Sequence, residues 1–183
     1  MITAGIDMGS RTVKVVFLEE LKVDGAPQLR WGVKGKHIMF PEDLDPDQAA
    51  DKAFEDALKG AGISRDQITR VVSTGSGRKQ VKFANADITE VGAGARGAVF
   101  MCPTAKTVVD VGAEEGRGVK ANAEGKVVDF AGNEKCAAGA GAFAESMSRA
   151  LQLSLKDFGE AGLRSAKTIS MNAQCTVFAE SVV

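Results

Sequence analysis

The chain of 183 residues lacks tyrosine, has one histidine and holds only three cysteines. An odd number of cysteines is a poor framework for disulfides, so we expect reduced thiols and a cytoplasmic protein. No apolar run approaches the roughly 18 residues that span a bilayer, and residues 1–7 read as a strand rather than a signal peptide. The formal net charge is −1, which provides no basic field for nucleic acid. We therefore expect neither a membrane nor a nucleic acid as a partner.

The Walker loop and the Rossmann glycine triplet, two widespread phosphate-binding motifs, are also missing. A different short pattern occurs twice: residues 5–10 read Gly-Ile-Asp-Met-Gly-Ser, and residues 108–113 read Val-Val-Asp-Val-Gly-Ala. In each copy an apolar strand pattern runs into Asp-x-Gly, a turn and a returning strand. The repeat predicts two related subdomains, residues 1–104 and 105–183.

Each Asp-x-Gly turn has residues that suit a phosphate and a magnesium ion. Gly9 lets backbone N–H groups approach a phosphate closely, and Ser10 adds a hydroxyl donor. The Asp7 carboxylate could hold Mg²⁺ through water, because hard cations take oxygen ligands. Asp110 and Gly112 repeat the pattern, so two opposed turns would bracket one nucleotide. A plain β-hairpin is the alternative for each turn, and the residues leave both interpretations open.

Two of the cysteines, Cys136 and Cys175, each lie just ahead of a helix-like stretch. A helix N-terminus favours an anionic thiolate, and the small residues after Cys136 leave room for an inorganic group. An iron–sulfur cube usually takes four thiolates, so a second chain would supply the other two. The alternative is a pair of buried, inert cysteines, because no Cys-x-x-Cys spacing is present. We interpret Cys102, beside Pro103, as structural.

Further elements follow from periodicity. The spacing of Ala50, Phe54 and Leu58 predicts a helix that ends at Gly60, and we expect another helix over 136–151 and a strand over 167–171. Between the two subdomains, Glu90 could orient a water and Arg96 could touch phosphate; a solvated helix face is the alternative. Residues 176–183 read as a helix just beginning, so we expect the second subdomain to be incomplete.

Six segments occur in the order of one known family. Together they resemble the ATPases that activate 2-hydroxyacyl-CoA dehydratases and drive class I benzoyl-CoA reductases, the BadF/BadG/BcrA/BcrD type. The segments are residues 7–10 (Asp-Met-Gly-Ser), 74–78 (Thr-Gly-Ser-Gly-Arg), 88–90 (Ile-Thr-Glu), 110–112 (Asp-Val-Gly), 133–139 (Asn-Glu-Lys-Cys-Ala-Ala-Gly) and 175–181 (Cys-Thr-Val-Phe-Ala-Glu-Ser). The two cysteine segments are specific to the family, whereas the Asp-x-Gly turns are shared by all ATPases of the actin, Hsp70 and sugar-kinase type.

The resemblance implies a ribonuclease H-like α/β fold, with two subdomains around ATP and Mg²⁺. It implies catalytic roles for Asp7, Asp110 and Glu90. It also implies that Cys136 and Cys175 give two ligands to a [4Fe–4S] cluster shared with a paralogous ATPase subunit. The implied nucleotide contacts are Gly9, Ser10, Arg11, Gly112, Ala113 and Glu114.

Within the family, the sequence looks most like the BcrD-type ATPase subunit of benzoyl-CoA reductase. Residues 112–115 read Gly-Ala-Glu-Glu, and residues 91–96 lack the Cys-His pair typical of dehydratase activators. The resemblance then implies ATP-driven electron transfer from ferredoxin to catalytic reductase subunits in anaerobic aromatic degradation. Three alternatives stay open: a homodimeric dehydratase activator, an acetate- or sugar-kinase-like phosphotransferase, and a non-catalytic actin-like domain. The last two would have no cluster.

Overall fold

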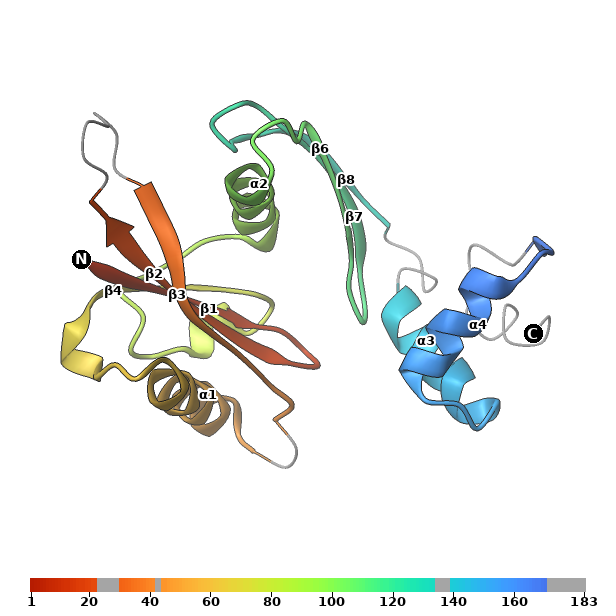
Figure 1. Cartoon of the computed structure of the whole chain (residues 1–183), viewed down its shortest axis with the longest axis horizontal. Helices are drawn as coiled ribbons and strands as arrows, with labels where there is room; N and C mark the ends of the chain where they lie inside the picture. Colours follow the sequence, from red (N-terminus) through yellow and green to blue (C-terminus); the bar gives the residue numbers. More distant parts are fainter. Residues whose placement is uncertain (23–29, 42–43, 134–138, 171–183) are drawn as a thin grey trace. The chain divides into compact units, whose positions relative to one another are not determined.

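The computed structural model describes residues 1–22, 30–41, 44–133 and 139–170. The chain divides into two compact units, Met1–Ala93 and Gly94–Val183 (Figure 1). The division falls inside one helix, α2, which runs over Glu90–Met101. Among the helices described, none is long and apolar enough to cross a membrane.

The first unit is built on a five-stranded sheet with the order β3-β2-β1-β4-β5. Strand β1 lies at its centre and pairs antiparallel with β2 and parallel with β4. One helix, α1 (Pro46–Ala61), packs against one face of this sheet (Figure 1). The strands are β1 (Ile2–Met8), β2 (Val13–Leu21), β3 (Arg30–Met39), β4 (Ile68–Thr74) and β5 (Ala86–Asp87).

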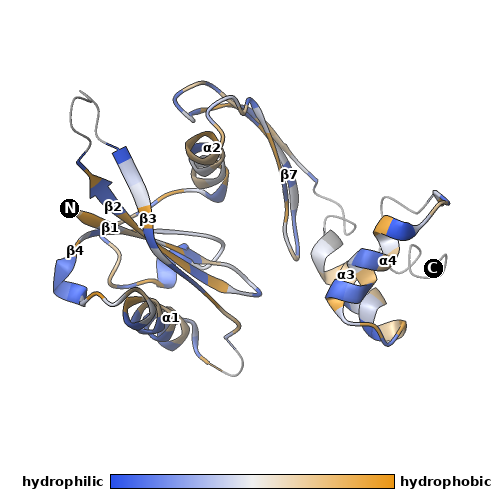
Figure 2. Cartoon of the chain, in the orientation of Figure 1, coloured by the Kyte–Doolittle hydropathy of each residue, from blue (hydrophilic) through white to orange (hydrophobic). Residues whose placement is uncertain are grey.

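The core of the first unit lies between the sheet and α1. Alternate residues of β1 and β2 are buried, as expected for strands with one covered face. Phe17 of β2 meets Phe54 of α1 edge to face, with 5.5 Å between ring centroids. The hydropathy colouring of Figure 2 shows α1 as an amphipathic helix, with polar residues on its outer side. The buried hydrophobic residues of the helix are Ala49, Ala50, Ala53, Phe54, Ala57 and Leu58.

The predicted end of α1 at Gly60 is wrong. The helix continues to Ala61 and ends at Gly62, whose φ of 65° is left-handed. Glycine tolerates that conformation better than any other residue, so Gly62 rather than Gly60 is the C-cap. The Gly62 N–H group donates to the carbonyl oxygens of Leu58 and Lys59.

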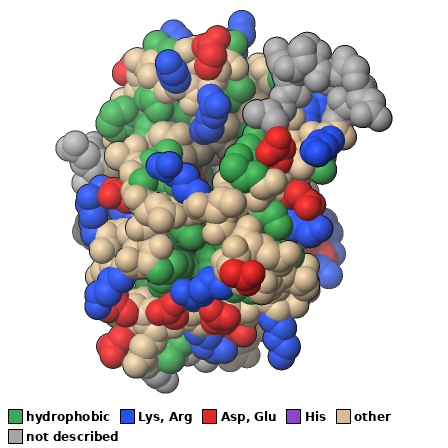
Figure 3. All heavy atoms as spheres, turned by 90° about the vertical axis from the view of Figure 1, so that its left-hand side faces the viewer, with side chains coloured by type: hydrophobic (Ala, Val, Ile, Leu, Met, Phe, Trp, Pro, Cys, Tyr) green, Lys and Arg blue, Asp and Glu red, His purple; other side chains and the backbone are tan. Residues whose placement is uncertain are grey.

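The solvent side of the first unit carries charges of both signs. Figure 3 shows acidic and basic side chains next to one another on the lower part of one face of the molecule. Around α1, Lys52 pairs with Asp56 at 3.0 Å, and Arg65 pairs with Asp51 at 3.1 Å. Exposed pairs of this kind contribute little to stability.

In the second unit, the end of α2 is followed by a three-stranded antiparallel sheet, β6 (Thr107–Val111), β7 (Gly116–Ala121) and β8 (Val127–Gly132). Two helices follow, α3 (Ala140–Ala150) and α4 (Leu155–Arg164). Ser154 caps α4 by accepting a hydrogen bond from the Asp157 N–H at 3.1 Å.

The strand predicted over 167–171 is wrong for its described part. Residues 165–170 have no regular secondary structure and are exposed. The Ser165 hydroxyl donates to the Lys167 carbonyl at 3.0 Å and accepts from the Lys167 N–H at 3.4 Å. Both backbone groups of Lys167 are therefore used locally, which removes them from any strand pairing.

Candidate functional site

The first Asp-x-Gly turn joins β1 to β2. The Gly9 N–H donates to the Thr12 carbonyl at 3.1 Å and closes the turn. Asp7 faces Lys14 across the hairpin, and the Lys14 Nζ donates to the Asp7 carboxylate at 2.9 Å. Ser10 and Arg11 form the exposed tip. The turn thus presents a carboxylate, a cation, a hydroxyl and backbone N–H groups within a few residues.

The second Asp-x-Gly turn joins β6 to β7 and is built in the same way. The Gly112 N–H donates to the Glu115 carbonyl at 2.7 Å. Asp110 faces Arg117 across the hairpin, with 3.7 Å between the carboxylate and the guanidinium. Arg117 also pairs with Glu115. The two turns share their hydrogen bond, their register and a cation opposite the aspartate.

Lys14 and Arg117 were missed by the sequence reasoning. The signal was present, because each cation follows its aspartate by seven positions, from 7 to 14 and from 110 to 117. In a tight antiparallel hairpin that spacing places the two side chains opposite each other on one face. Asp7 and Lys14 lie in the first unit, and Asp110 and Arg117 in the second.

A third loop adjoins the first turn. This loop, residues 74–78, begins at the last residue of β4, which runs parallel to β1 with Thr74 in register with Asp7. The Gly77 N–H donates to the Met8 carbonyl at 2.8 Å. At Gly75, a Cβ atom would lie 2.4 Å from the Met8 oxygen and 2.6 Å from Asp7 Oδ1. Only glycine fits there, so the loop backbone touches the residues that carry the candidate chemistry.

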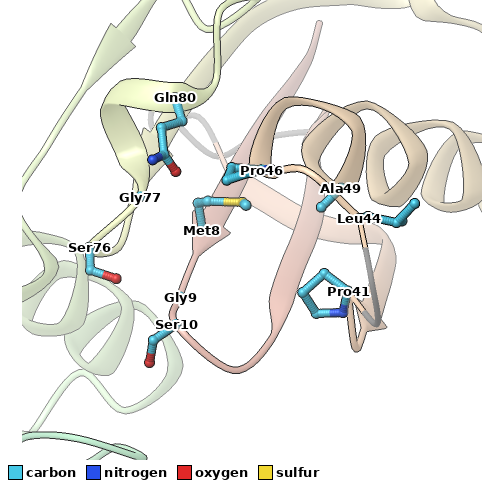
Figure 4. A pocket seen from close by; sticks show the side chains of 10 residues that line it. All are labelled: Met8, Gly9, Ser10, Pro41, Leu44, Pro46, Ala49, Ser76, Gly77 and Gln80. Atoms are coloured by element: carbon cyan, nitrogen blue, oxygen red, sulfur yellow. The ribbon is translucent and has the colours of Figure 1, made fainter.

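A hollow of about 380 Å³ lies beside these two loops (Figure 4). Ser10, Ser76 and Gln80 lie on one side of it, with apolar residues on the other and Met8 between them (Figure 4). Its lining is Met8, Gly9, Ser10, Pro41, Leu44, Pro46, Ala49, Ser76, Gly77 and Gln80. The hollow therefore combines hydroxyl and amide groups with an apolar wall next to the first turn.

The donors at the first turn suit a hydrated magnesium ion and a phosphate. The Asp7 side chain is 34% exposed, so its carboxylate is open to a ligand. The Thr74 hydroxyl is buried and has no hydrogen-bond partner among the residues that the structure describes. Buried hydroxyls normally have a hydrogen-bond partner, and a bound water or ligand beside Asp7 would provide one for Thr74. Hard cations prefer oxygen ligands of this kind.

The two linker residues have different surroundings. Glu90 begins α2 and is half-buried; Thr89 caps the helix by accepting the Gly92 N–H at 3.2 Å. Arg96, in the second unit, donates to the Glu124 carbonyl in the β7–β8 turn. Gly125 packs on the Arg96 backbone, where a Cβ would lie 3.0 Å from its Cα. These contacts give Arg96 a structural role in holding that turn.

The start of α3 rests on the second turn. The Gly141 N–H donates to the Gly112 carbonyl, and the Ala142 N–H donates to the Ala113 carbonyl, both at 3.1 Å. A Cβ at Gly141 would lie 2.7 Å from the Gly112 oxygen. Two N–H groups that a helix start normally leaves unsatisfied are therefore used to hold the turn. Glu114, between these contacts and β7, is exposed.

The two predicted metal ligands, Cys136 and Cys175, lie outside the described residues. Within the described ranges, no three His, Cys, Asp or Glu side chains are grouped as a metal site would need. Cys102 is exposed at the end of α2, where its thiol lies 3.5 Å from the Thr104 hydroxyl. Hydrogen bonds from that hydroxyl and then from the Thr104 and Ala105 backbone lower the pKa of Cys102.

Comparison with known proteins agrees with the motifs. Residues 4–183 match the BadF/BadG/BcrA/BcrD ATPase family. The chain is 35% identical over 190 residues to the activator of lactoyl-CoA dehydratase from Anaerotignum propionicum, covering 100% of this chain and 66% of the relative. It is 31% identical over 182 residues to a benzoyl-CoA reductase subunit from Thauera aromatica, covering 100% of this chain and 62% of that relative.

A solved structure shows the same fold. The activator of the 2-hydroxyisocaproyl-CoA dehydratase from Clostridium difficile, solved with bound ADPNP, superposes with a TM-score of 0.81 at 26% identity, covering 100% of this chain and 64% of that one. The predicted α/β fold of the actin, Hsp70 and sugar-kinase-like ATPases is thereby confirmed. The chain spans slightly less than two thirds of the length of these proteins. Because the family match extends over almost every residue, the chain belongs to the BadF/BadG/BcrA/BcrD ATPase family.

Proposed function

We propose that this chain is the ATP-hydrolysing part of a protein that activates a 2-hydroxyacyl-CoA dehydratase by ATP-driven electron transfer. The observation that carries the proposal is the pair of matched turns, in which Asp7 and Asp110 each stand opposite a cation in the same register. Duplicated turns of this kind suit a nucleotide held between two related subdomains, which we place at 1–104 and 105–183. The relative solved with ADPNP supports a nucleotide as the ligand.

In this proposal each turn contributes to nucleotide binding. Backbone N–H groups of both turns hold phosphate oxygens, and the two aspartates orient Mg²⁺ through water. Lys14 and Arg117 balance the aspartates before the nucleotide arrives and then face the phosphates. Glu90 orients the attacking water. The nucleotide contacts are Gly9, Ser10, Arg11, Gly112, Ala113 and Glu114.

The contact between α3 and the second turn supports coupling of ATP to electron transfer. A phosphate that displaces Gly112 and Ala113 also displaces the first turn of α3, because Gly141 and Ala142 are hydrogen-bonded to them. Cys136 precedes this helix by only a few residues. A change in the nucleotide state would thereby alter the surroundings of the sulfur ligand.

We assign Cys136 and Cys175 as two ligands of a [4Fe–4S] cluster, with two further thiolates from a second subunit. Such a cluster would supply one-electron transfer chemistry at these two cysteines. In an activator the second subunit is another copy of this chain, and in a reductase it is a paralogous ATPase subunit. Reduced ferredoxin is the proposed donor in both cases, and the proposed compartment is the cytoplasm.

The dehydratase activator is favoured over the reductase that the sequence motifs suggested. Identity to the lactoyl-CoA dehydratase activator is 35%, against 31% for the benzoyl-CoA reductase relative. The residue pattern at 112–115 that favoured the reductase has another explanation, because Glu115 pairs with Arg117 within the hairpin. An ATPase subunit of benzoyl-CoA reductase remains the second candidate, supported by the missing Cys-His pair at 91–96.

The test is reconstitution under anaerobic conditions. Full-length protein, reduced ferredoxin and ATP are mixed with the catalytic component of a 2-hydroxyacyl-CoA dehydratase or with that of a benzoyl-CoA reductase. We expect ATP-dependent activity with the dehydratase. Activity with the reductase alone would establish the second candidate. Colourless protein that phosphorylates a hydroxylated acceptor would instead indicate a kinase-like enzyme.

A further inference from the structure

The loop over residues 74–78 has no role in the function proposed above, although it touches Asp7. We propose that Arg78 is a positioning residue, which holds this loop against the end of β1 and thereby sets the Asp7 carboxylate for ATP turnover. The inference rests on the proposed ATPase function. It assigns a role to the Thr-Gly-Ser-Gly-Arg motif.

The loop over residues 74–78 and the end of β1 form one packed unit. The Gly77 N–H donates to the Met8 carbonyl at 2.8 Å. A Cβ at Gly77 would lie 2.6 Å from Met8 Cγ, and one at Gly75 would lie 2.6 Å from Asp7 Oδ1. Any displacement of this loop toward the strand therefore moves Asp7 or Met8.

Arg78 fixes this loop through both its side chain and its backbone. Its Nη1 and its backbone N–H both donate to the Gly75 carbonyl, each at 3.2 Å. Its Nε donates to Asp87 of β5 at 3.2 Å. Its own carbonyl accepts from the hydroxyl of Ser73 at 3.0 Å, and Ser73 is 1% exposed. One residue thus connects the loop to β4 and β5, two neighbouring strands of the sheet.

The backbone conformation of Gly75 needs a contact that holds it in place. Its φ of 94° lies in the left-handed region, where glycine has alternatives of similar energy on the other side of the map. The planar guanidinium makes hydrogen bonds in fixed directions, so it restrains the Gly75 carbonyl in a way that a lysine ammonium would not. The ion pair with Asp87 is partly exposed and adds little to stability, which makes orientation its main effect.

Lys79 provides a matched comparison. Its Nζ lies 2.8 Å from Asp87 Oδ1, but its side chain is 74% exposed and no described contact joins it to Gly75. The hydrogen bond from Lys79 is the main cause that lowers the pKa of Asp87, and Arg78 adds a smaller contribution. Replacing Lys79 therefore removes one of the cations paired with Asp87. The two hydrogen bonds from Arg78 to the Gly75 carbonyl stay in place.

The experiment compares Arg78→Lys, Asp87→Asn and Lys79→Ala in two measurements. The first is amide hydrogen exchange at Gly77 in nucleotide-free protein. We expect exchange about 10-fold faster in Arg78→Lys, a smaller increase in Asp87→Asn, and no change in Lys79→Ala. The second is ATP turnover by the assembled protein. We expect kcat to fall about 10- to 100-fold in Arg78→Lys with KM for ATP nearly unchanged, because a displacement of about 1 Å is enough to misalign a reacting group.

Each measurement can overturn the inference. Unchanged exchange at Gly77 in Arg78→Lys, or equal acceleration in Lys79→Ala, would show that Arg78 does not hold the loop. Faster exchange with unchanged kcat would show that the loop does not set Asp7. If assembled wild-type protein fails to hydrolyse ATP, the proposed function is wrong, and the exchange rates still decide whether Arg78 holds the loop. If Arg78→Lys does not fold, Asp87→Asn is the variant that tests the inference, because it keeps Arg78 and changes the carboxylate to which its Nε donates.

Discussion

Lys14 stands opposite Asp7 across the first hairpin, with its Nζ 2.9 Å from the carboxylate. Arg117 stands opposite Asp110 in the second hairpin at the same register, at 3.7 Å. Each aspartate therefore has a neutralising cation within its own hairpin. Both aspartates are partly exposed, so these pairs are weak, and a phosphate or a metal ion can displace them at little cost.

Asp7→Asn and Asp110→Asn should each reduce ATP turnover by about 100-fold or more, because each removes a charge that orients Mg²⁺ at the reacting phosphate. Turnover is measured with full-length, assembled protein. Asp129→Asn is the matched control, since Asp129 is exposed on β8 and its carboxylate accepts the N–H of its neighbour Phe130. Normal turnover in both Asp7→Asn and Asp110→Asn would remove these residues from the mechanism.

Gly141→Ala should weaken the coupling between nucleotide and cluster. The added Cβ would lie 2.7 Å from the Gly112 oxygen, so the first turn of α3 can no longer rest on the second hairpin turn. We expect the ATP-dependent change in chelator access to the cluster to fall about 5-fold or more. Gly159→Ala in α4 is the control, because nothing described lies within 4 Å of its Cβ position. A normal response in Gly141→Ala would contradict the coupling.

Cys136→Ser and Cys175→Ser should each lose iron. Protein purified without oxygen is expected to be brown and to carry about two irons per chain, which is four shared between two subunits. Cys102→Ser should keep its full iron content, because Cys102 lies exposed at the end of α2. Iron analysis and an absorbance spectrum measure this. Full iron content in Cys136→Ser or in Cys175→Ser would contradict the assignment of that cysteine as a cluster ligand.

Cys102 should react with iodoacetamide at a lower pH than an ordinary thiol. Hydrogen bonds led by that of the Thr104 hydroxyl lower its pKa, so the thiolate is populated at a lower pH. Thr104→Val removes that hydroxyl and should raise the pKa, which shifts the alkylation profile to higher pH. Mass spectrometry of the peptide around residue 102 reports the rate. Superimposable profiles would show that Thr104 does not act on the thiol.

Local signals in the sequence were sufficient for most elements of the fold. The alternation over 2–8 and 13–21 reflects which side chains face the core, and an Asp-x-Gly turn closes a hairpin through contacts between near neighbours. The end of α1 was misplaced because Gly60 and Gly62 are equally capable of ending a helix, and only the backbone conformation distinguishes them.

The contacts that define the candidate site could not be predicted from local sequence patterns. Residues 74–78 meet Asp7 and Met8 because β4 pairs with β1, which joins segments more than sixty positions apart in the chain. The support of the second turn by Gly141 and Ala142 depends on backbone N–H groups that almost every residue possesses. The hydrogen bond from the Arg78 guanidinium to the Gly75 carbonyl depends on where the fold places that side chain. Amino-acid types therefore predicted the hairpins and the candidate ligands. Long-range strand pairing and packing decided which loops hold them, because backbone hydrogen bonds between distant segments leave no pattern in the residue types.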